Sequence, residues 1–123
     1  MSFAVSQYRT NNIDTASPAQ IVVKLYDGAV RFMRQASAAI EAKDFAKKGV
    51  ALSKAHAIVS ELQATLNPDH APELCRELDR LYEYVLYCIT EANVHAKLEP
   101  LEPAIQVMNQ LRIGWEQLAK EGP

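Results

Sequence analysis

Apolar residues recur at every third or fourth position along most of this chain, and this spacing constrains the fold more than any other feature. It places apolar side chains on one face of an α-helix, whereas a strand requires alternation with a period of two. Short stretches that contain prolines, asparagines or aspartates interrupt the pattern. The interruptions divide the chain into four segments, residues 18–42, 45–66, 72–96 and 100–120. The sequence therefore predicts four amphipathic helices and no sheet.

The connections between these segments are short, near residue 43, residues 67–71 and residues 97–99. They cannot span a helix of roughly 30–36 Å, so successive helices must run in opposite directions. We predict an all-α, antiparallel up-down four-helix bundle that occupies residues 17–121 as one domain. Residues 1–16 are polar with isolated apolar side chains, and we expect them to form an irregular, mobile N-terminal arm.

The first predicted helix has a clear start at Ser17, Pro18 and Gln20. A serine can cap the helix, proline suits its first position, and a glutamine three residues after the serine completes a capping box. Gly28 and Ala29 follow in mid-helix, where a glycine lowers helix propensity by about 1 kcal/mol. We interpret this small pair as a close helix–helix crossing.

Each predicted helix has one row of apolar residues that should face the core. Among the aromatic residues, we expect Tyr26 and Phe32 mainly in the core and Trp115 on the row of the last helix. The row of the third helix is Leu74, Leu78, Leu81, Val85, Cys88 and Ala92, and that of the fourth is Leu101, Ala104, Met108, Leu111, Trp115 and Leu118.

The third helix has more apolar surface than such a row needs. Between residues 81 and 89 only Glu83 is plainly polar. A large exposed apolar patch usually marks a partner site, and tyrosines suit one because the ring packs while the hydroxyl stays in water. We predict that partner contacts come from residues beside the core rows, namely Ile58, Tyr82, Leu86, Ile89 and Ile105. The same surface could instead join copies of this chain, so a structural homo-oligomer is an alternative.

Composition excludes several classes of function. The 123 residues have a net charge of −2, without a basic face that would make nucleic acid the main partner. No apolar run approaches the roughly 18 residues of a membrane span, and the N-terminus lacks the features of a leader. Cys75 and Cys88 lie about 20 Å apart along one predicted helix, too far for a disulfide. We therefore expect reduced thiols, a cytoplasmic protein and no membrane insertion.

The chain also lacks the patterns of catalytic and metal-binding helical bundles. A di-iron bundle needs two Glu-x-x-His pairs, whereas Glu91 and His95 are four residues apart and lack partners. We expect no metal, no cofactor and no enzymatic activity. One alternative is a phosphotransfer bundle that acts through His56, although Ala57, Ile58 and Val59 follow it instead of the usual lysine and glycine.

Several short motifs resemble one known family, the flagellar secretion chaperones called FliS. The resemblance is strongest from Tyr8 to Met33 and weaker in the third and fourth helices. Its parts are Tyr8, Asn12, Thr15-Ala16-Ser17-Pro18, Leu25-Tyr26-Asp27-Gly28-Ala29, Arg31-Phe32, Glu91-Ala92-Asn93, and Leu111-Arg112 with Trp115. One departure is Gln20, where the family commonly has glutamate.

The resemblance implies a small cytoplasmic bundle that binds the disordered C-terminal segment of flagellin in apolar surface grooves. Such a chaperone prevents premature polymerisation and delivers its client to the flagellar type III export apparatus. By the same resemblance, the arm takes part through Tyr8, which contacts the client surface and engages an export gate component. We expect a monomer or weak homodimer when the chaperone is free.

Overall fold

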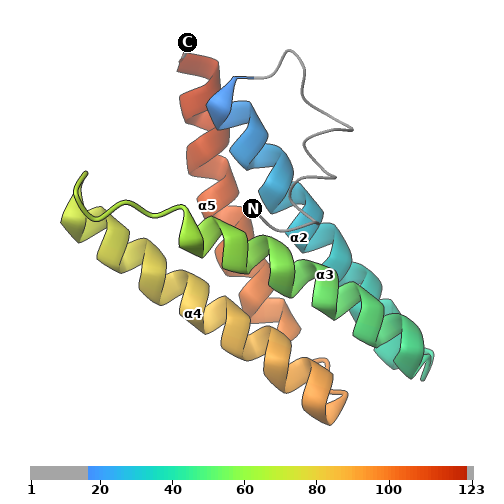
Figure 1. The fold of residues 1–123 in the computed structure, drawn as a ribbon. Coiled ribbons are helices and arrows are strands. Elements are labelled where there is room, and N and C mark those ends of the chain that lie inside the picture. The colour runs from blue at the N-terminus through green and yellow to red at the C-terminus, as the bar shows by residue number, and fades with distance from the viewer. Residues whose placement is uncertain (1–16, 122–123) are drawn as a thin grey trace.

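The computed structural model describes residues 17–121, which form four α-helices: α2 (Pro18–Glu41), α3 (Phe45–Ala64), α4 (Pro72–His95) and α5 (Leu101–Glu121). Each helix packs against the next along the chain, and α5 packs back against α2 (Figure 1). No strand is present in this part of the chain. The predicted antiparallel four-helix bundle is confirmed, with helix ends that differ from the predicted ones by one or two residues.

The predicted helix start is present in full. The Ser17 N–H donates to Gln20 Oε1 at 2.8 Å, and the Gln20 N–H donates to Ser17 Oγ at 3.2 Å. Pro18 occupies the first turn of α2. At the next helix, the Lys47 N–H donates to Asp44 Oδ1 at 3.1 Å, so Asp44 caps α3. These caps satisfy amide groups that would otherwise lack partners.

Each of the three connections contains a non-glycine residue in the left-handed backbone region. These residues are Lys43, Ala71 and Ala96, with φ of 59°, 49° and 52°. A left-handed conformation costs an L-residue roughly 1–2 kcal/mol. At Lys43 and Ala96 it follows the end of a helix and helps the chain reverse within a few residues, whereas Ala71 lies directly before the start of α4.

The core lies at one end of the bundle. The buried residues of α4 lie between positions 82 and 92, and those of α5 lie between positions 101 and 108. The core includes Tyr26, and Gly28 and Ala29 are buried as well. The largest fully buried side chains are Tyr26, Met33, Leu52, Ile58, Ile89, Leu101, Met108, Val59 and Val85. The close crossing at Gly28 and Ala29 stays a prediction.

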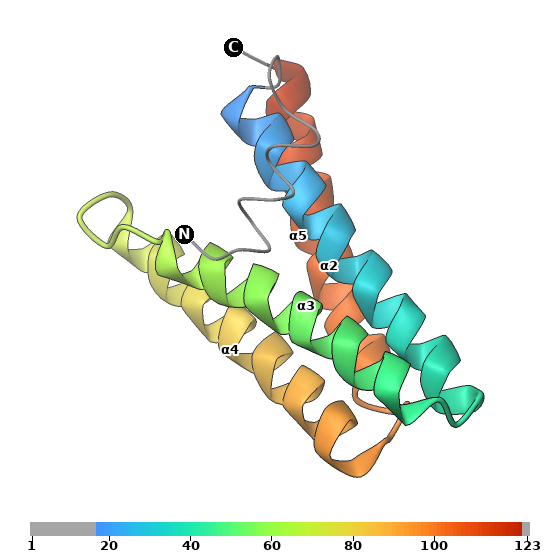
Figure 2. The same cartoon turned by 45° about the vertical axis from the view of Figure 1, so that its right-hand side comes forward.

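The helices form two pairs that diverge away from this core. In both views α2 runs beside α5 and α3 beside α4, and the two pairs separate toward the start of α2, the end of α5 and the connection between α3 and α4 (Figures 1 and 2). Of the four neighbouring helix pairs, α4 and α5 make the sparsest contact. The first half of α4 and the second half of α5 therefore extend beyond the shared core.

Four of the residues predicted to contact a partner are part of the core instead. Tyr82 is 2% exposed, and Ile58, Ile89 and Ile105 are equally enclosed. The prediction was wrong because it gave each helix one narrow buried row. Since α4 packs against both α3 and α5 and its Tyr82 meets Tyr26 of α2, it buries a wider face. The apolar side chains of α4 that seemed to exceed the needs of one core row are mostly buried inside the bundle.

Polar contacts join helices that are distant in sequence. Within the core, the Tyr26 and Tyr82 hydroxyls are 2.5 Å apart and link α2 to α4. Arg112 of α5 forms an ion pair with Asp27 of α2. On the other helix pair, Gln63 Nε2 donates to carboxylates of Asp79 and Glu83, and Lys48 Nζ donates to the Asn93 carbonyl at 2.7 Å.

Candidate functional site

The core-facing row of α4 continues beyond the core. Leu78 and Leu74 precede Val85 by seven and eleven residues, which keeps all three on one helix face. Leu78 and Leu81 are half-buried, and Leu74 is 58% exposed. Because the first half of α4 has diverged from α5, these leucines are covered only in part, and Leu74 is largely uncovered.

On α5 the core-facing row also continues beyond the core, in this case toward the C-terminal end of the helix. Leu111 and Trp115 are half-buried at the edge of the core, and Leu118 is 52% exposed. We call the six residues Leu74, Leu78, Leu81, Leu111, Trp115 and Leu118 the open surface. All six were predicted to belong to core rows, so that prediction holds only for part of each row.

Two hollows border the open surface. One of about 530 Å³ lies between α4 and α5, where Leu81, Tyr84, Val107 and Leu111 supply its apolar lining. The other, of about 480 Å³, lies between the first turn of α2 and the last turns of α5. Pro18, Val22, Trp115, Leu118 and Ala119 supply its apolar lining. Hollows of this size along a helical ridge can accept side chains of a bound helix.

Trp115 connects the open surface with the interior. Burial raises the pKa of Tyr26 above its ordinary value, against the opposing hydrogen bonds of Tyr82 and Trp115. Burial also raises the pKa of Tyr82, and the neighbouring Tyr26 adds to the rise. Both phenols therefore stay neutral at physiological pH.

The remaining predicted residues have mixed outcomes. Leu86 is half-buried at the edge of the core, so a partner contact there stays a prediction. Tyr8 lies outside the described residues. Tyr26 is in the core as predicted, whereas Phe32 is only partly buried.

Sequence reasoning missed that the outer ends of the α4 and α5 rows are uncovered. One signal was available in α4, since five of the eight residues from 73 to 80 are charged. Such density indicates that most sides of the helix face water at that point, whereas residues 84–90 contain no charge.

The histidines and acidic side chains of the described residues form no metal-binding cluster. Between residues 17 and 121, no group of three or more histidine, cysteine, aspartate or glutamate side chains is placed to hold a metal ion. His95 Nε2 lies 3.2 Å from Glu91 Oε2 as a local pair, and His56 Nδ1 lies 3.3 Å from Ser60 Oγ on an exposed stretch of α3. None of the helices in this range has the length and apolarity that crossing a bilayer requires.

The fold is that of an all-α four-helix bundle that leaves an apolar surface partly uncovered. The model of the family described as flagellar protein FliS matches residues 1–122. A flagellar secretion chaperone FliS of Bacillus subtilis (strain 168) is 32% identical over 110 residues, which is 89% of this chain and 81% of that protein. The chain therefore belongs to the FliS family of flagellar secretion chaperones.

Two further comparisons agree with this assignment. The flagellar secretion chaperone FliSB of Pseudomonas aeruginosa is 29% identical over 117 residues, 92% of this chain and 93% of that protein. A crystal structure described as a flagellar chaperone from bacteria superposes with a TM-score of 0.77 over 93% of each chain, at 24% identity. The solved structure supports the fold, and family membership supports a role in flagellar export.

Proposed function

We propose that this protein is a cytoplasmic export chaperone that binds the disordered C-terminal segment of flagellin on its open surface. Binding would prevent premature polymerisation and keep the client ready for the flagellar type III export apparatus. The observation that supports this proposal most directly is the uncovered end of the two core rows, from Leu74 on α4 to Leu118 on α5.

An amphipathic segment can complete these rows as an additional helix would. Apolar side chains at every third or fourth position of the client would pack between α4 and α5 in the manner of a helix in a groove. Because the client is disordered when free, it orders only where an apolar surface is offered. The protein acts in this proposal by binding and not by catalysis.

The size of the open surface predicts a moderate affinity. Covering six half-exposed or exposed large side chains would contribute roughly 5–9 kcal/mol from the chaperone side alone. Ordering the client costs roughly 2–5 kcal/mol or more, and association has its own entropic cost. The balance allows stable capture together with release at the export gate.

The N-terminal arm keeps its predicted part in this proposal. Tyr8, outside the described residues, would contact the client surface and engage the export gate component. The free protein is expected to be a monomer or weak homodimer. A structural homo-oligomer would instead use the open surface to bind a second copy.

Calorimetric titration with the last ~50 residues of flagellin tests the proposal. We expect binding with a clearly negative heat-capacity change, because apolar surface is buried. Leu118→Asp should weaken binding at least tenfold. Ile113→Asp is the matched control, since Ile113 lies on another face of α5 with 56% exposure, and it should change affinity less than about twofold.

A second matched pair lies on α4, where Leu74→Asp should weaken binding and Val94→Asp should not. Circular dichroism of all four variants confirms that the bundle remains folded. If folded Leu74→Asp and Leu118→Asp proteins bind the segment as tightly as the unsubstituted chain, the client does not use the open surface. A stable dimer at nanomolar concentration would favour the homo-oligomer.

A further inference from the structure

A glycine lies beside the apolar row at the outer end of α5. Gly114 follows Leu111 by three residues and precedes Leu118 by four, so it shares the side of the helix that carries the open surface. Val107 and Gln110, which precede Gly114 by seven and four residues, line the hollow between α4 and α5. Gly114 therefore continues the face of α5 that borders this hollow, and it is exposed.

No packing contact within the described part of the chain requires a glycine at this position. A Cβ atom built on Gly114 would meet no atom within 4 Å, so the helix has room for a side chain there. Glycine is the poorest helix former after proline, because its backbone loses the most conformational freedom on folding. The bundle thus has a helix-weakening residue at an open position beside its apolar surface, and the space is available to a bound partner.

Four residues of α5 surround this space in the arrangement that receives a side chain from a second helix. When helices pack, a large side chain of one inserts into a hole formed by four residues of the other, at positions i, i+3, i+4 and i+7. Leu111, Gly114, Trp115 and Leu118 have this spacing, and we call these four residues the socket. Three corners of the socket are apolar side chains of the open surface, and the glycine corner makes it deeper.

The socket joins the two hollows that border the open surface. Leu111 lines the hollow between α4 and α5, whereas Trp115 and Leu118 line the hollow beside the first turn of α2. Because Gly114 has no side chain, it raises no ridge between them. A helix that lies along α5 can therefore contact both hollows while one of its side chains enters the socket.

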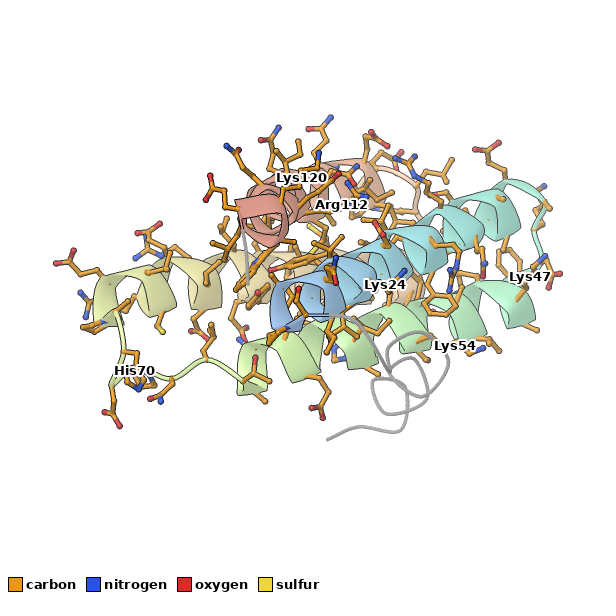
Figure 3. The ribbon with its side chains drawn as sticks, turned by 90° about the horizontal axis from the view of Figure 1, so that it is seen from above. Lys24, Lys47, Lys54, His70, Arg112 and Lys120 are labelled. Carbon is orange, nitrogen blue, oxygen red and sulfur yellow. The ribbon has the colours of Figure 1, made fainter. Side chains whose placement is uncertain are left out.

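Ion pairs attach the neighbouring side of α5 to the bundle. Arg112 binds Asp27 of α2, and its Nη1 atom lies 2.7 Å from Glu116 Oε2. Lys120 Nζ lies 3.8 Å from Glu116 Oε1. Figure 3 looks down on this end of the bundle and shows α5 nearly end-on, with Arg112 and Lys120 beside it. These contacts join α5 to α2 next to the socket and leave the socket itself uncovered.

We propose that the socket receives one large apolar side chain of the client, a leucine, methionine or phenylalanine, and that Gly114 is the positioning residue that gives it room. This role of the socket rests on the proposed function, because the client is the same amphipathic segment. The inserted side chain fixes the register of the segment on α5, since residues three or four positions away then face the two hollows. Buried anchors of this kind carry much of the binding energy of an interface.

A leucine at position 114 tests the role of the socket, and Gly49 supplies the matched control. Gly49 also lies inside a helix with no atom within 4 Å of a built Cβ, but it is on α3 and outside the open surface. Leucine improves helix propensity at either position, so both variants should keep or raise the Tm of the unsubstituted chain. In calorimetric titration with the last ~50 residues of flagellin, Gly114→Leu should bind at least tenfold more weakly, whereas Gly49→Leu should change affinity less than twofold.

An alanine scan of the client identifies the side chain that enters the socket. Each large apolar residue of the segment is replaced by alanine in turn, and each peptide is titrated against the unsubstituted chain and against Gly114→Leu. We expect one replacement that weakens binding to the unsubstituted chain at least tenfold but weakens binding to Gly114→Leu less than twofold. The filled socket no longer holds that side chain, so its loss has little further effect.

The possible failures can be told apart. If the folded, unsubstituted chain does not bind the segment, both the proposed function and the role of the socket are wrong. If the segment binds, but Gly114→Leu binds it as tightly as Gly49→Leu does, client capture stands and the socket is not used. The same conclusion follows if every alanine replacement weakens binding to Gly114→Leu as much as binding to the unsubstituted chain.

Discussion

The buried hydroxyl pair of Tyr26 and Tyr82 provides a test of how the bundle sets its geometry. Tyr82→Phe removes one hydroxyl and leaves the ring, while Tyr26 loses its hydrogen-bond partner at 2.5 Å. An orphaned buried polar group costs about 1–3 kcal/mol. Because the ring and its packing remain, we expect a loss of about 1–2 kcal/mol in the free energy of unfolding. This corresponds to a fall of roughly 5–10 °C in Tm.

A double-mutant cycle separates the pair from its surroundings. Removing both hydroxyls leaves no orphaned group, so Tyr26→Phe with Tyr82→Phe should be less destabilising than the sum of the single changes. We expect a coupling energy of about 1–2 kcal/mol from urea unfolding followed by circular dichroism. Additive single effects, each below about 0.5 kcal/mol, would show that the two hydroxyls do not depend on each other.

The same pair predicts a pH dependence with a definite sign. Burial raises the pKa of both Tyr26 and Tyr82 in the folded chain, whereas an unfolded tyrosine titrates near 10. Above pH 10 the unfolded chain releases protons that the folded chain retains, so stability falls as pH rises. The limiting slope is about 1.4 kcal/mol per pH unit for each tyrosine. Relative to the unsubstituted chain, the double phenylalanine variant should lose less stability between about pH 10 and 11.5.

Two further changes test the connections and the α2–α5 contact. Ala96→Gly should raise the free energy of unfolding by about 0.5–1 kcal/mol because Ala96 has a left-handed backbone, whereas Ala38→Gly, at an exposed position inside α2, should lower it by about 1 kcal/mol. Shifts of the same sign in urea unfolding would contradict this backbone assignment. Arg112→Gln should cost at most about 1 kcal/mol, because its pair with Asp27 is partly exposed, and the cost should shrink in about 1 M salt. A cost that grows with salt would show that the ion pair is not its source.

Local sequence signals predicted the elements of this fold well. The capping box at Ser17 and Gln20 and the breakers before Pro72 act within a few residues, so their outcome depends little on the rest of the chain. A spacing of three or four likewise predicts a helix whatever the helix packs against. These features were sufficient to predict four antiparallel helices.

The assignment of surface and core failed because it depends on how the helices cross. Leu74 and Val85 lie on one face of α4, yet one is 58% exposed and the other is enclosed. Tyr82 was assigned to the surface because a single row seemed sufficient for the core. The divergence of the two helix pairs and the contact of Tyr82 with Tyr26 decide these positions, and neither is encoded in local spacing.

The chemistry of a docking surface explains why sequence alone confuses it with a core. A helix that receives a partner helix needs leucines at the same spacing as a helix that packs inside its own bundle. Under the proposed function a single row of α4 would serve both purposes, since residues 82–92 belong to the bundle core and the row continues through the partly buried Leu78 to the exposed Leu74. A client that fills the open end would extend the existing core. Its binding should therefore raise the stability of the first half of α4 more than that of α3, which hydrogen exchange can measure.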